Sequence, residues 1–511
     1  MRNLLRNFRW GLDGSLQDML VENGRVTWRR PAGASDKGHD LGGKWLLPKF
    51  VDSHCHILPT GLDLGKLHLG RCSSRDDVLQ AVRERLPSVE AGRWLHAVHY
   101  DQTRFADGGH LTRWDLDKVS TNVPILLRHV NGHAGVANSA ALALAGVSGE
   151  TSDPAGGEYR RDSSGRPDGV LLERTLEIVG SAAPQPTEDE MVTAIRAAAQ
   201  HMSKLGIGCA SDMMTGSFDL LTELRAYRRA SESSSDVRFR LYLQWSPLLG
   251  RRAADPEQVR EEIEAMDPDR CRVAGVKIFA DGAIASATAA IYGRFLTEGP
   301  QGPTPGTSGQ LMYPPERLTE MVRVAHDAGH PLAIHAIGDY AVDLVMDAYE
   351  AVGDARRHRI EHVMILSDQQ IDRLKRLGCR CTMQPEFLFR LGHAYHKQLG
   401  PERAARLKRA RSVLDAGIPL SFSSDRPIVA GDPWDGIRTA VARPAGFDPE
   451  ENVTLWEALL AYTQWGADTN GDGDLMGSLE PGQLADYQVL DGWPEHAPQP
   501  TMLNGVMSRT T

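Results

Sequence analysis

The sequence has no long hydrophobic run. No uninterrupted apolar stretch approaches the ~18 residues that a helix needs to cross a bilayer, so we expect no membrane partner. The first residues, MRNLLRNFRWGLDGS, contain neither the sustained apolar segment nor the small-residue cleavage site of a secretory signal. These absences predict a cytoplasmic protein.

Cysteine, positive charge and internal repetition are also scarce. Only 6 of the 511 residues are cysteine, and they are widely scattered, which excludes a small disulfide-stabilised scaffold. Lys and Arg number 57 against 67 Asp and Glu, for a net charge of −10. Nucleic-acid-binding proteins normally carry a basic surface, so we expect no nucleic-acid partner. No fixed-period repeat is visible, which argues against a solenoid or a propeller.

What is present predicts an α/β fold built on a (β/α)8 barrel. Eight short apolar runs have the character of buried strands, and most are followed by a stretch with apolar residues at helical spacing. Strand–helix alternation repeated eight times is typical of a (β/α)8, or TIM, barrel. The eight runs are residues 50–54, 206–211, 239–244, 275–280, 331–336, 359–363, 380–384 and 419–424.

The two ends of the chain differ from the centre. MLVENGRVTW near the start reads as two strands around an Asn-Gly turn, and GSLEPGQLADYQVLDGW near the end reads as strand, turn and strand. We therefore expect residues 1–49 and 470–511 to form one small β-sandwich domain beside a barrel of residues 50–469.

A long segment follows the first predicted strand and exceeds any ordinary βα loop. We interpret residues 58–201 as an inserted subdomain that folds, because it contains Trp94, Phe105, Trp114 and Leu126. An insertion at the carboxyl end of a barrel strand lies at the active-site mouth. The segment is therefore expected to act as a lid that limits substrate size.

The strongest local motif is His54-Cys55-His56, which directly follows an apolar run. Side chains of a strand repeat every two residues, so both imidazoles point to the same side. Two neutral imidazoles placed in this way can share one metal ion. The motif alone is weak evidence, because the chain has 18 histidines.

Four later strands each carry one polar residue that strengthens the metal hypothesis: Lys277, His335, His362 and Asp425. Each has a structural alternative, because strand histidines are often hydrogen-bonded core residues, lysines snorkel and acids cap helices. Together they favour a site, since barrel strands direct such residues toward one mouth and their burial without partners would be costly.

Lys277 differs from the other candidates, because an ammonium group cannot coordinate a cation. A lysine in a low-polarity site can have a depressed pKa, and its neutral amine can then react with carbon dioxide. The resulting carbamate is an anion that can bridge two metal ions. The alternative is a lysine paired with a nearby carboxylate such as Asp281.

Seven segments, in this order, resemble amidohydrolase family 3, the YtcJ-like branch of the amidohydrolase superfamily. The segments are LLPKFVDSHCHIL, VNGHAGVANSAAL, VKIFADGAIASATA, LAIHAIGDYAVD, RIEHVMI, SFSSDRPI and GSLEPGQLADYQVLD. The branch includes N-substituted formamide deformylase. The resemblance spans nearly the whole chain and implies a distorted (β/α)8 barrel with a β-sandwich from both termini.

The resemblance also implies a binuclear centre, whose ligands would be His54, His56, Lys277, His335, His362 and Asp425. Carboxylated Lys277 would bridge the two ions, and Asp425 would activate the bridging hydroxide and pass a proton to the leaving group. We expect two divalent ions, zinc first, although iron or manganese would suit the same ligands.

Three further residues are candidates for substrate contacts. Arg426 stands where the family usually has Trp or Thr, and Glu386 stands where it frequently has His. Both residues therefore bear on the substrate class. His133, in Asn-Gly-His-Ala of the inserted segment, is a candidate oxyanion donor, with a purely structural turn residue as the equal alternative.

The leading hypothesis is a metal-dependent hydrolase that cleaves the C–N bond of a small-molecule amide or N-substituted formamide. A hydrolytic deaminase or cyclic-amide hydrolase of the same superfamily is the alternative, although no H-x-x-E pattern follows His335 and deamination does not need Lys277. A non-catalytic protein on a hydrolase fold is the alternative from another class. The sequence leaves a homodimer open.

Overall fold

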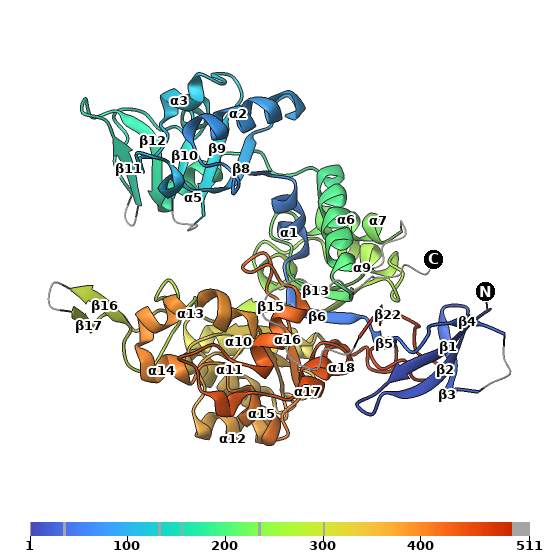
Figure 1. The fold of residues 1–511 in the computed structure, drawn as a ribbon. Helices are drawn as coiled ribbons and strands as arrows, with labels where there is room; N and C mark the ends of the chain where they lie inside the picture. The colour runs from blue at the N-terminus through green and yellow to red at the C-terminus, as the bar shows by residue number, and fades with distance from the viewer. Residues whose placement is uncertain are drawn as a thin grey trace. The chain divides into compact units, whose positions relative to one another are not determined.

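The computed structural model shown in Figure 1 describes residues 2–33, 37–130, 134–154, 157–232, 237–299 and 302–492. The chain forms two compact units. The first combines residues 1–61 with residues 191–511, and the second consists of residues 62–190. The second unit is shorter than the predicted insertion of residues 58–201, because residues 58–61 and 191–201 belong to the first unit.

The first unit contains an eight-stranded sheet in which all neighbouring strands are parallel, in the order β21-β20-β19-β18-β15-β14-β13-β6. Each of the eight strands overlaps one of the eight predicted runs, which confirms the α/β barrel fold. The strands are β6 (Phe50–Cys55), β13 (Ile207–Thr215), β14 (Arg238–Gln244), β15 (Cys271–Phe279), β18 (Leu332–Ala336), β19 (Arg359–His362), β20 (Arg380–Met383) and β21 (Leu420–Phe422).

The first and last strands of this sheet meet just beyond their carboxyl ends. The Asp425 N–H donates to the His54 carbonyl oxygen at 2.8 Å, and the His56 N–H donates to the Arg426 carbonyl oxygen at 2.9 Å. In addition, the Asp52 carboxylate accepts hydrogen bonds from the backbone N–H and the hydroxyl of Ser424. The barrel is therefore closed where the candidate ligands lie.

Helices lie outside this sheet (Figure 1). They include α6 (Glu188–Lys204), α7 (Leu220–Glu232), α9 (Pro256–Glu264), α10 (Pro315–Asp327), α11 (Asp339–Val352), α12 (Asp368–Leu377), α13 (Glu386–Leu399), α15 (Ala410–Asp415), α16 (Pro433–Val441), α17 (Leu455–Ala461) and α18 (Gln464–Asn470). Helix α12 shows why these segments are helical. A capping box of Ser367 and Gln370 starts it, Ile371 and Leu374 are buried, and left-handed Gly378 ends it.

The chain ends also form a β-domain in the first unit. Its six-stranded sheet combines β22 (Tyr487–Leu490) with β1 (Arg2–Trp10), β2 (Ser15–Glu22), β3 (Arg25–Pro31), β4 (His39–Asp40) and β5 (Trp45–Pro48). The predicted Asn23-Gly24 turn joins β2 to β3, and both residues have the positive φ that such a hairpin turn requires. Phe8, Met19 and Leu46 are fully buried in this domain.

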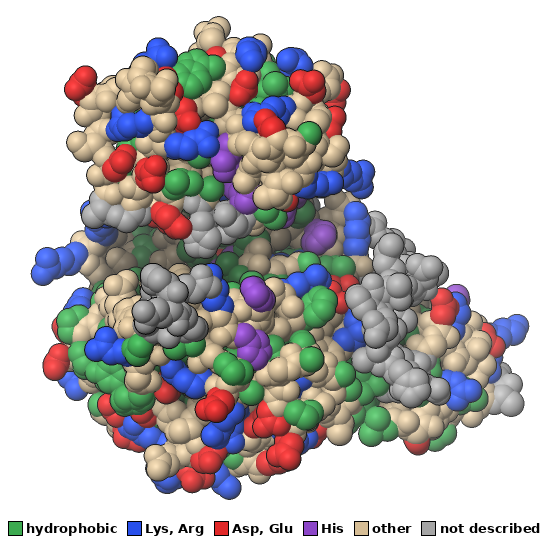
Figure 2. All heavy atoms as spheres, turned by 60° about the vertical axis from the view of Figure 1, so that its left-hand side comes forward, with side chains coloured by type: hydrophobic (Ala, Val, Ile, Leu, Met, Phe, Trp, Pro, Cys, Tyr) green, Lys and Arg blue, Asp and Glu red, His purple; other side chains and the backbone are tan. Residues whose placement is uncertain are grey.

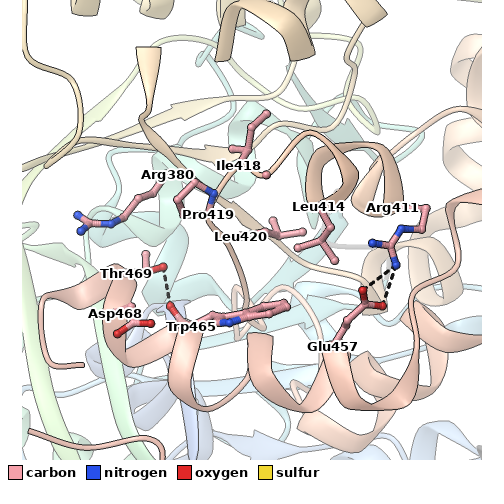
Figure 3. Close-up of a pocket in the computed structure, with 11 residues that line it drawn as sticks. Arg380, Arg411, Leu414, Ile418, Pro419, Leu420, Glu457, Trp465, Asp468 and Thr469 are labelled. Carbon is pink, nitrogen blue, oxygen red and sulfur yellow. Dashed lines mark hydrogen bonds and ion pairs between the residues drawn. The ribbon is translucent and has the colours of Figure 1, made fainter. Parts of the chain in front are cut away.

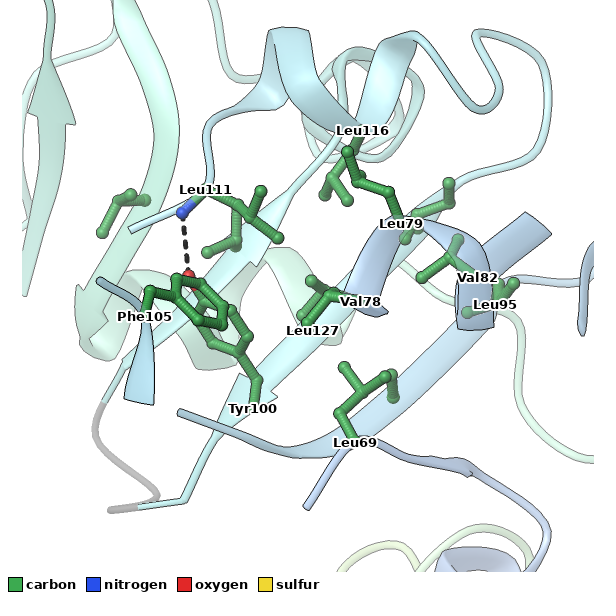
Figure 4. Packing of buried hydrophobic residues seen from close by; sticks show 14 residues of the cluster. Leu69, Val78, Leu79, Val82, Leu95, Tyr100, Phe105, Leu111, Leu116 and Leu127 are labelled. Carbon is green, nitrogen blue, oxygen red and sulfur yellow. Dashed lines mark hydrogen bonds between the residues drawn. The ribbon is translucent and has the colours of Figure 1, made fainter. Parts of the chain in front are cut away.

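The second unit has its own hydrophobic core, drawn in Figure 4. Its sheet has the order β11-β12-β10-β9-β8-β7, formed by Gly157–Arg161, Pro167–Glu173, Ala134–Ala137, Ile125–His129, Leu95–Tyr100 and Leu67–His68. Helix α2 (Arg75–Arg85) contributes Val78 and Val82 to the core, and the Tyr100 hydroxyl accepts the Leu111 N–H at 2.8 Å. The unit is therefore a folded body.

Three of the four apolar residues that predicted a folded insertion are buried. Trp94, Phe105 and Leu126 are at most 7% exposed. Trp114 is 37% exposed, and the guanidinium of Arg166 lies 5.5 Å from its ring centre. Trp114 therefore adds less to the core than its size led us to expect.

The charges of the surface are mixed. On the face drawn in Figure 2, Lys and Arg side chains are interspersed with Asp and Glu. Among the described residues, no helix combines the length and the apolar character required to cross a membrane. All six cysteines are free thiols, and five of them are buried.

Candidate metal centre

The predicted ligand residues lie at or near the carboxyl ends of five barrel strands. His54 belongs to β6, and His56 follows that strand directly. Lys277, His335 and His362 lie in β15, β18 and β19. Asp425 follows β21. Parallel strands of one barrel present these ends to a common mouth, so the fold brings residues distant in sequence together.

His54, His56 and Asp425 form the tightest group. Their ligand atoms lie within 4.8 Å of one another. Asp425 Oδ1 is 2.8 Å from His56 Nε2 and 3.4 Å from His54 Nε2. Although burial opposes ionisation, the two histidines hold the pKa of Asp425 well below its usual range. Two imidazoles and a carboxylate at this spacing are suitable ligands for one divalent ion.

His335 and His362 extend this group. The His362 ring centre lies 4.5 Å from that of His335 and 4.7 Å from that of His54. Burial lowers the pKa of His335 to about 3 and that of His362 well below its ordinary value, with repulsion by neighbouring positive charges adding to the effect. Both rings are therefore neutral near pH 7, the form in which imidazole binds metals.

Lys277 is fully enclosed beside the histidines. It is 1% exposed, and its Nζ has no hydrogen-bond partner among the described residues. Burial lowers the pKa of Lys277 to about 8, while the carboxylates of Glu361 and Asp425 oppose the shift. A buried amine without a hydrogen-bond partner is costly, and its depressed pKa gives it a neutral, nucleophilic fraction.

Asp281, the carboxylate considered as a partner for Lys277, has other partners. It accepts hydrogen bonds from the backbone N–H groups of Ala290, Ile337 and Gly338 at 2.8–3.0 Å. Its Oδ1 lies 3.4 Å from His335 Nε2. Asp281 therefore fixes the loop around His335, and no ion pair joins it to Lys277 in the described part of the chain.

Two residues of the site were not predicted from the sequence. Glu361 Oε2 lies 2.5 Å from His54 Nδ1, and Glu361 Oε1 accepts a hydrogen bond from Arg359. Burial opposes ionisation of Glu361, but the charge of Arg359 and the hydrogen bond with His54 outweigh it and lower the pKa to about 2. The carboxylate orients the His54 ring and leaves Nε2 free to face Asp425. The available signal was the i, i+2 spacing of Arg359 and Glu361 within a buried strand.

The two substrate candidates of the barrel are both buried and have partners within the protein. Glu386 accepts hydrogen bonds from Arg390 Nε and the Gly431 N–H, each at 3.0 Å. Arg426 donates to the Gly431 carbonyl oxygen, and its Nε lies 3.8 Å from Asp52. Contact of either side chain with substrate stays a prediction.

His133, the third substrate candidate, lies outside the described residues, so its contact with substrate also stays a prediction. Closure of the inserted segment over the active site also stays a prediction.

Two site residues have strained backbones. His362 has a φ of 74° and Asp425 a φ of 58°, values that non-glycine residues rarely adopt. Such strain is typical of functional sites, where the surrounding structure imposes it. Both residues lie where a strand ends, and the unusual backbone is part of how their side chains reach the group.

A separate pocket, drawn in Figure 3, lies at the opposite end of the barrel. Arg380 and Leu420, which begin β20 and β21, line it together with Trp465 and the ion pair of Arg411 with Glu457. Because the candidate ligands occupy the carboxyl ends of the strands, this pocket is not part of the metal site.

The barrel carries a group of residues that could hold a metal ion, and comparison with known proteins identifies the family. The sequence model of the amidohydrolase family matches residues 37–510. The chain therefore belongs to the amidohydrolase family, and it is a hydrolase acting on carbon–nitrogen bonds.

Relatives and solved structures agree with this assignment. The chain is 31% identical to N-substituted formamide deformylase of Arthrobacter pascens, over 93% of this chain and 90% of that protein. It is 30% identical to YtcJ of Bacillus subtilis (strain 168), named as an amidohydrolase, over 89% of this chain and 85% of that protein. The crystal structure of an uncharacterized metal-dependent hydrolase from Pyrococcus furiosus superimposes with a TM-score of 0.78 at 28% identity, covering 97% of this chain and 100% of that one.

Proposed function

We propose that this protein hydrolyses the C–N bond of an amide or N-substituted formamide at a centre that holds two divalent ions. The observation that carries the proposal is the convergence of four histidines and Asp425. Lys277, a buried amine without a hydrogen-bond partner among the described residues, interacts electrostatically with Asp425, His335 and His362 of this group. The relative named N-substituted formamide deformylase supports the substrate class.

The residues present fit a pair of metal ions. His335 and His362 are neutral, Glu361 orients His54, and Asp425 is an ionised carboxylate. Lys277 is the one cationic group among them, and its repulsion of metal would be removed by conversion to a carbamate. We propose that His54, His56 and Asp425 hold one ion, that His335 and His362 hold the other, and that carboxylated Lys277 bridges them. Zinc is the first candidate, followed by iron and manganese.

Bound ions would supply two effects, polarisation of the substrate carbonyl and a lowered pKa of the attacking water. Asp425 would accept a proton from that water, because its carboxylate is ionised and lies at the centre of the group. The same carboxyl would then give the proton to the leaving nitrogen as the C–N bond breaks. The products of a formamide would be formate and an amine.

The neighbours of the histidines would hold them in place during this reaction. Glu361 orients His54 through Nδ1, and Gln384 accepts the Nδ1–H of His362. Both rings are thereby left with Nε2 as the atom available to a metal. The binding of substrate would not require these rings to reorient.

The test is a substrate panel with the protein purified without chelator. N-substituted formamides, simple amides, cyclic amides and aminated heterocycles are offered, and release of amine, formate or ammonia is measured. The proposal expects amine release from open-chain amides or formamides. Ammonia from an aminated ring would support the deaminase instead, and ring opening alone would support a cyclic-amide hydrolase.

A parent protein that binds metal but cleaves nothing in a broad panel would favour the non-catalytic alternative. The matched control is Asp425→Asn, which keeps an oxygen at the same position but cannot take the proton. Activity that persists undiminished in this variant would come from a contaminant or from another site.

A further inference from the structure

A second buried lysine, Lys408, lies behind His362. It is 2% exposed, and its Nζ donates to Gln384 Oε1 at 3.0 Å. No carboxylate lies within ion-pair distance of this nitrogen in the described part of the chain, although the Phe387 ring centre is 5.1 Å away. A buried lysine directed at an uncharged amide is unusual, because lysine is rarely buried without an acidic partner.

The backbone of Lys408 is fixed. Its N–H donates to the Met364 carbonyl oxygen at 2.8 Å, and its own carbonyl accepts a hydrogen bond from Arg443 Nη1 at 2.7 Å. The residue has a φ of 51°, which a non-glycine residue adopts only when its surroundings impose it. The side chain therefore starts from a defined position.

Gln384 links this lysine to a candidate metal ligand. Its Oε1 accepts a second hydrogen bond from His362 Nδ1 at 2.8 Å. On the other side of the amide, Nε2 donates to the Ser423 hydroxyl at 3.0 Å, and that hydroxyl is itself 3.3 Å from the Met383 carbonyl oxygen. The amide thus has a donor-rich side and an acceptor side.

The direction of each hydrogen bond follows from this arrangement. An amide oxygen can only accept, so the nitrogen of Lys408 donates to it. The same oxygen then requires a donor at His362 Nδ1, which fixes the proton on that atom. The Nε2 lone pair of His362 is left available.

We propose that Lys408 is a positioning residue: by holding the Gln384 amide oxygen toward His362 Nδ1, it fixes the His362 tautomer that presents Nε2 to a metal ion. The inference rests on the proposed metal-binding function, because it assigns His362 a ligand role. In this arrangement Lys408 supports Gln384, and Gln384 in turn supports His362. Rotation of the Gln384 amide would break both contacts.

Lys408 can donate a hydrogen bond to the Gln384 amide oxygen in either protonation state. Burial lowers the pKa of this lysine to about 7, with the Asp425 carboxylate opposing the shift. Both the ammonium and the neutral amine carry N–H groups that can donate to the amide oxygen. The ammonium has no lone pair, so it also excludes the flipped amide, in which Nε2 would face the lysine.

The test measures metal retention rather than turnover. Parent, Lys408→Met and Gln384→Met proteins are loaded with zinc and dialysed against graded chelator, and the ions left per chain are counted. Met fills the space of either side chain but cannot form the hydrogen bonds that link Lys408, Gln384 and His362. We expect one ion to be retained about 10–100-fold more weakly in each variant, which is the usual cost of losing such a supporting contact. The exposed Lys375→Met is the matched control and should behave as the parent.

The double variant Lys408→Met/Gln384→Met separates this role from a general one. If Lys408 acts through Gln384, the double variant retains metal no worse than Gln384→Met alone. Parental retention in Lys408→Met, or losses that multiply in the double variant, would overturn the proposal.

A metal-bound crystal structure of the parent keeps the proposal testable even if Lys408→Met does not fold. The proposal expects the ion at His362 Nε2, with Lys408 and His362 Nδ1 both on Gln384 Oε1. An ion at Nδ1, or a lysine turned away, would overturn it. The two proposals can fail separately: a parent that keeps two ions but cleaves no amide contradicts only the proposed function.

Discussion

Asp425 and His54 contact each other both through the backbone and through their side chains. The Asp425 N–H donates to the His54 carbonyl oxygen at 2.8 Å, and Asp425 Oδ1 lies 3.4 Å from His54 Nε2. The first contact helps to join the last strand of the barrel to the first strand. Closure of the barrel and assembly of the candidate metal centre therefore depend on the same pair of residues.

Replacement of Lys277 by alanine is expected to reduce turnover by ~10²-fold or more while the fold persists. The proposed bridging anion would be lost, and the two cations would face each other with less screening. Turnover, metal content and circular dichroism are the measurements, with Lys375→Ala as the surface control.

Partial recovery of Lys277→Ala with acetate or propionate would show that a carboxylate can replace the proposed carbamate. Parental turnover in Lys277→Ala would instead reduce this lysine to a structural residue.

Asp425→Asn is expected to lose catalysis more than metal. The asparagine oxygen can still face His54 and His56, but it cannot accept a proton from water. Loss of a general base typically costs ~10²–10⁴-fold in rate. Metal content and kcat are measured on the same preparation. If both fall in proportion, Asp425 serves chiefly as a ligand.

The ion pair of Glu361 with Arg359 should make the stability of the metal-free protein sensitive to acid. The pKa of Glu361 is lowered from 4.5 to about 2 in the folded protein. A depressed carboxyl pKa contributes stability that is complete above about pH 4.5 and is lost as the pH falls toward 2. Urea unfolding of the metal-free parent and of Glu361→Gln between pH 3 and 7 tests this.

At pH 7 the glutamine variant should be less stable by about 3–5 kcal/mol, because Arg359 would be left buried without its partner charge. The difference between the proteins should narrow as the pH falls. A difference independent of pH would show that the contribution of Glu361 does not depend on its charge.

The barrel strands could be predicted from the sequence, and so could the position of the ligand residues at the strand ends. Both features depend on local sequence. Apolar runs mark buried barrel strands, and the spacing of His54 and His56 places both on one side of the chain. One polar residue near the end of each of four later strands then predicted a shared location, since the fold itself brings strand ends together.

The supporting residues could not be predicted, because their partners are distant in sequence. Lys408 lies in the charged stretch Leu-Lys-Arg-Ala-Arg, which is typical of a solvent-exposed segment, yet the fold buries it against Gln384. Trp114 shows the opposite error, since a large apolar residue proved to be partly exposed. Burial of a side chain depends on which elements pack against it, and local pattern does not determine that.

Diffraction data collected at the zinc absorption edge from crystals grown without chelator would test the central claim most directly. The account predicts two anomalous peaks per chain, one near His54, His56 and Asp425 and one near His335 and His362. It also predicts density for a carbamate that extends from Lys277 Nζ between the peaks. If zinc has been supplied and the density shows no bound ion and an unmodified Lys277 amine, the central claim is contradicted.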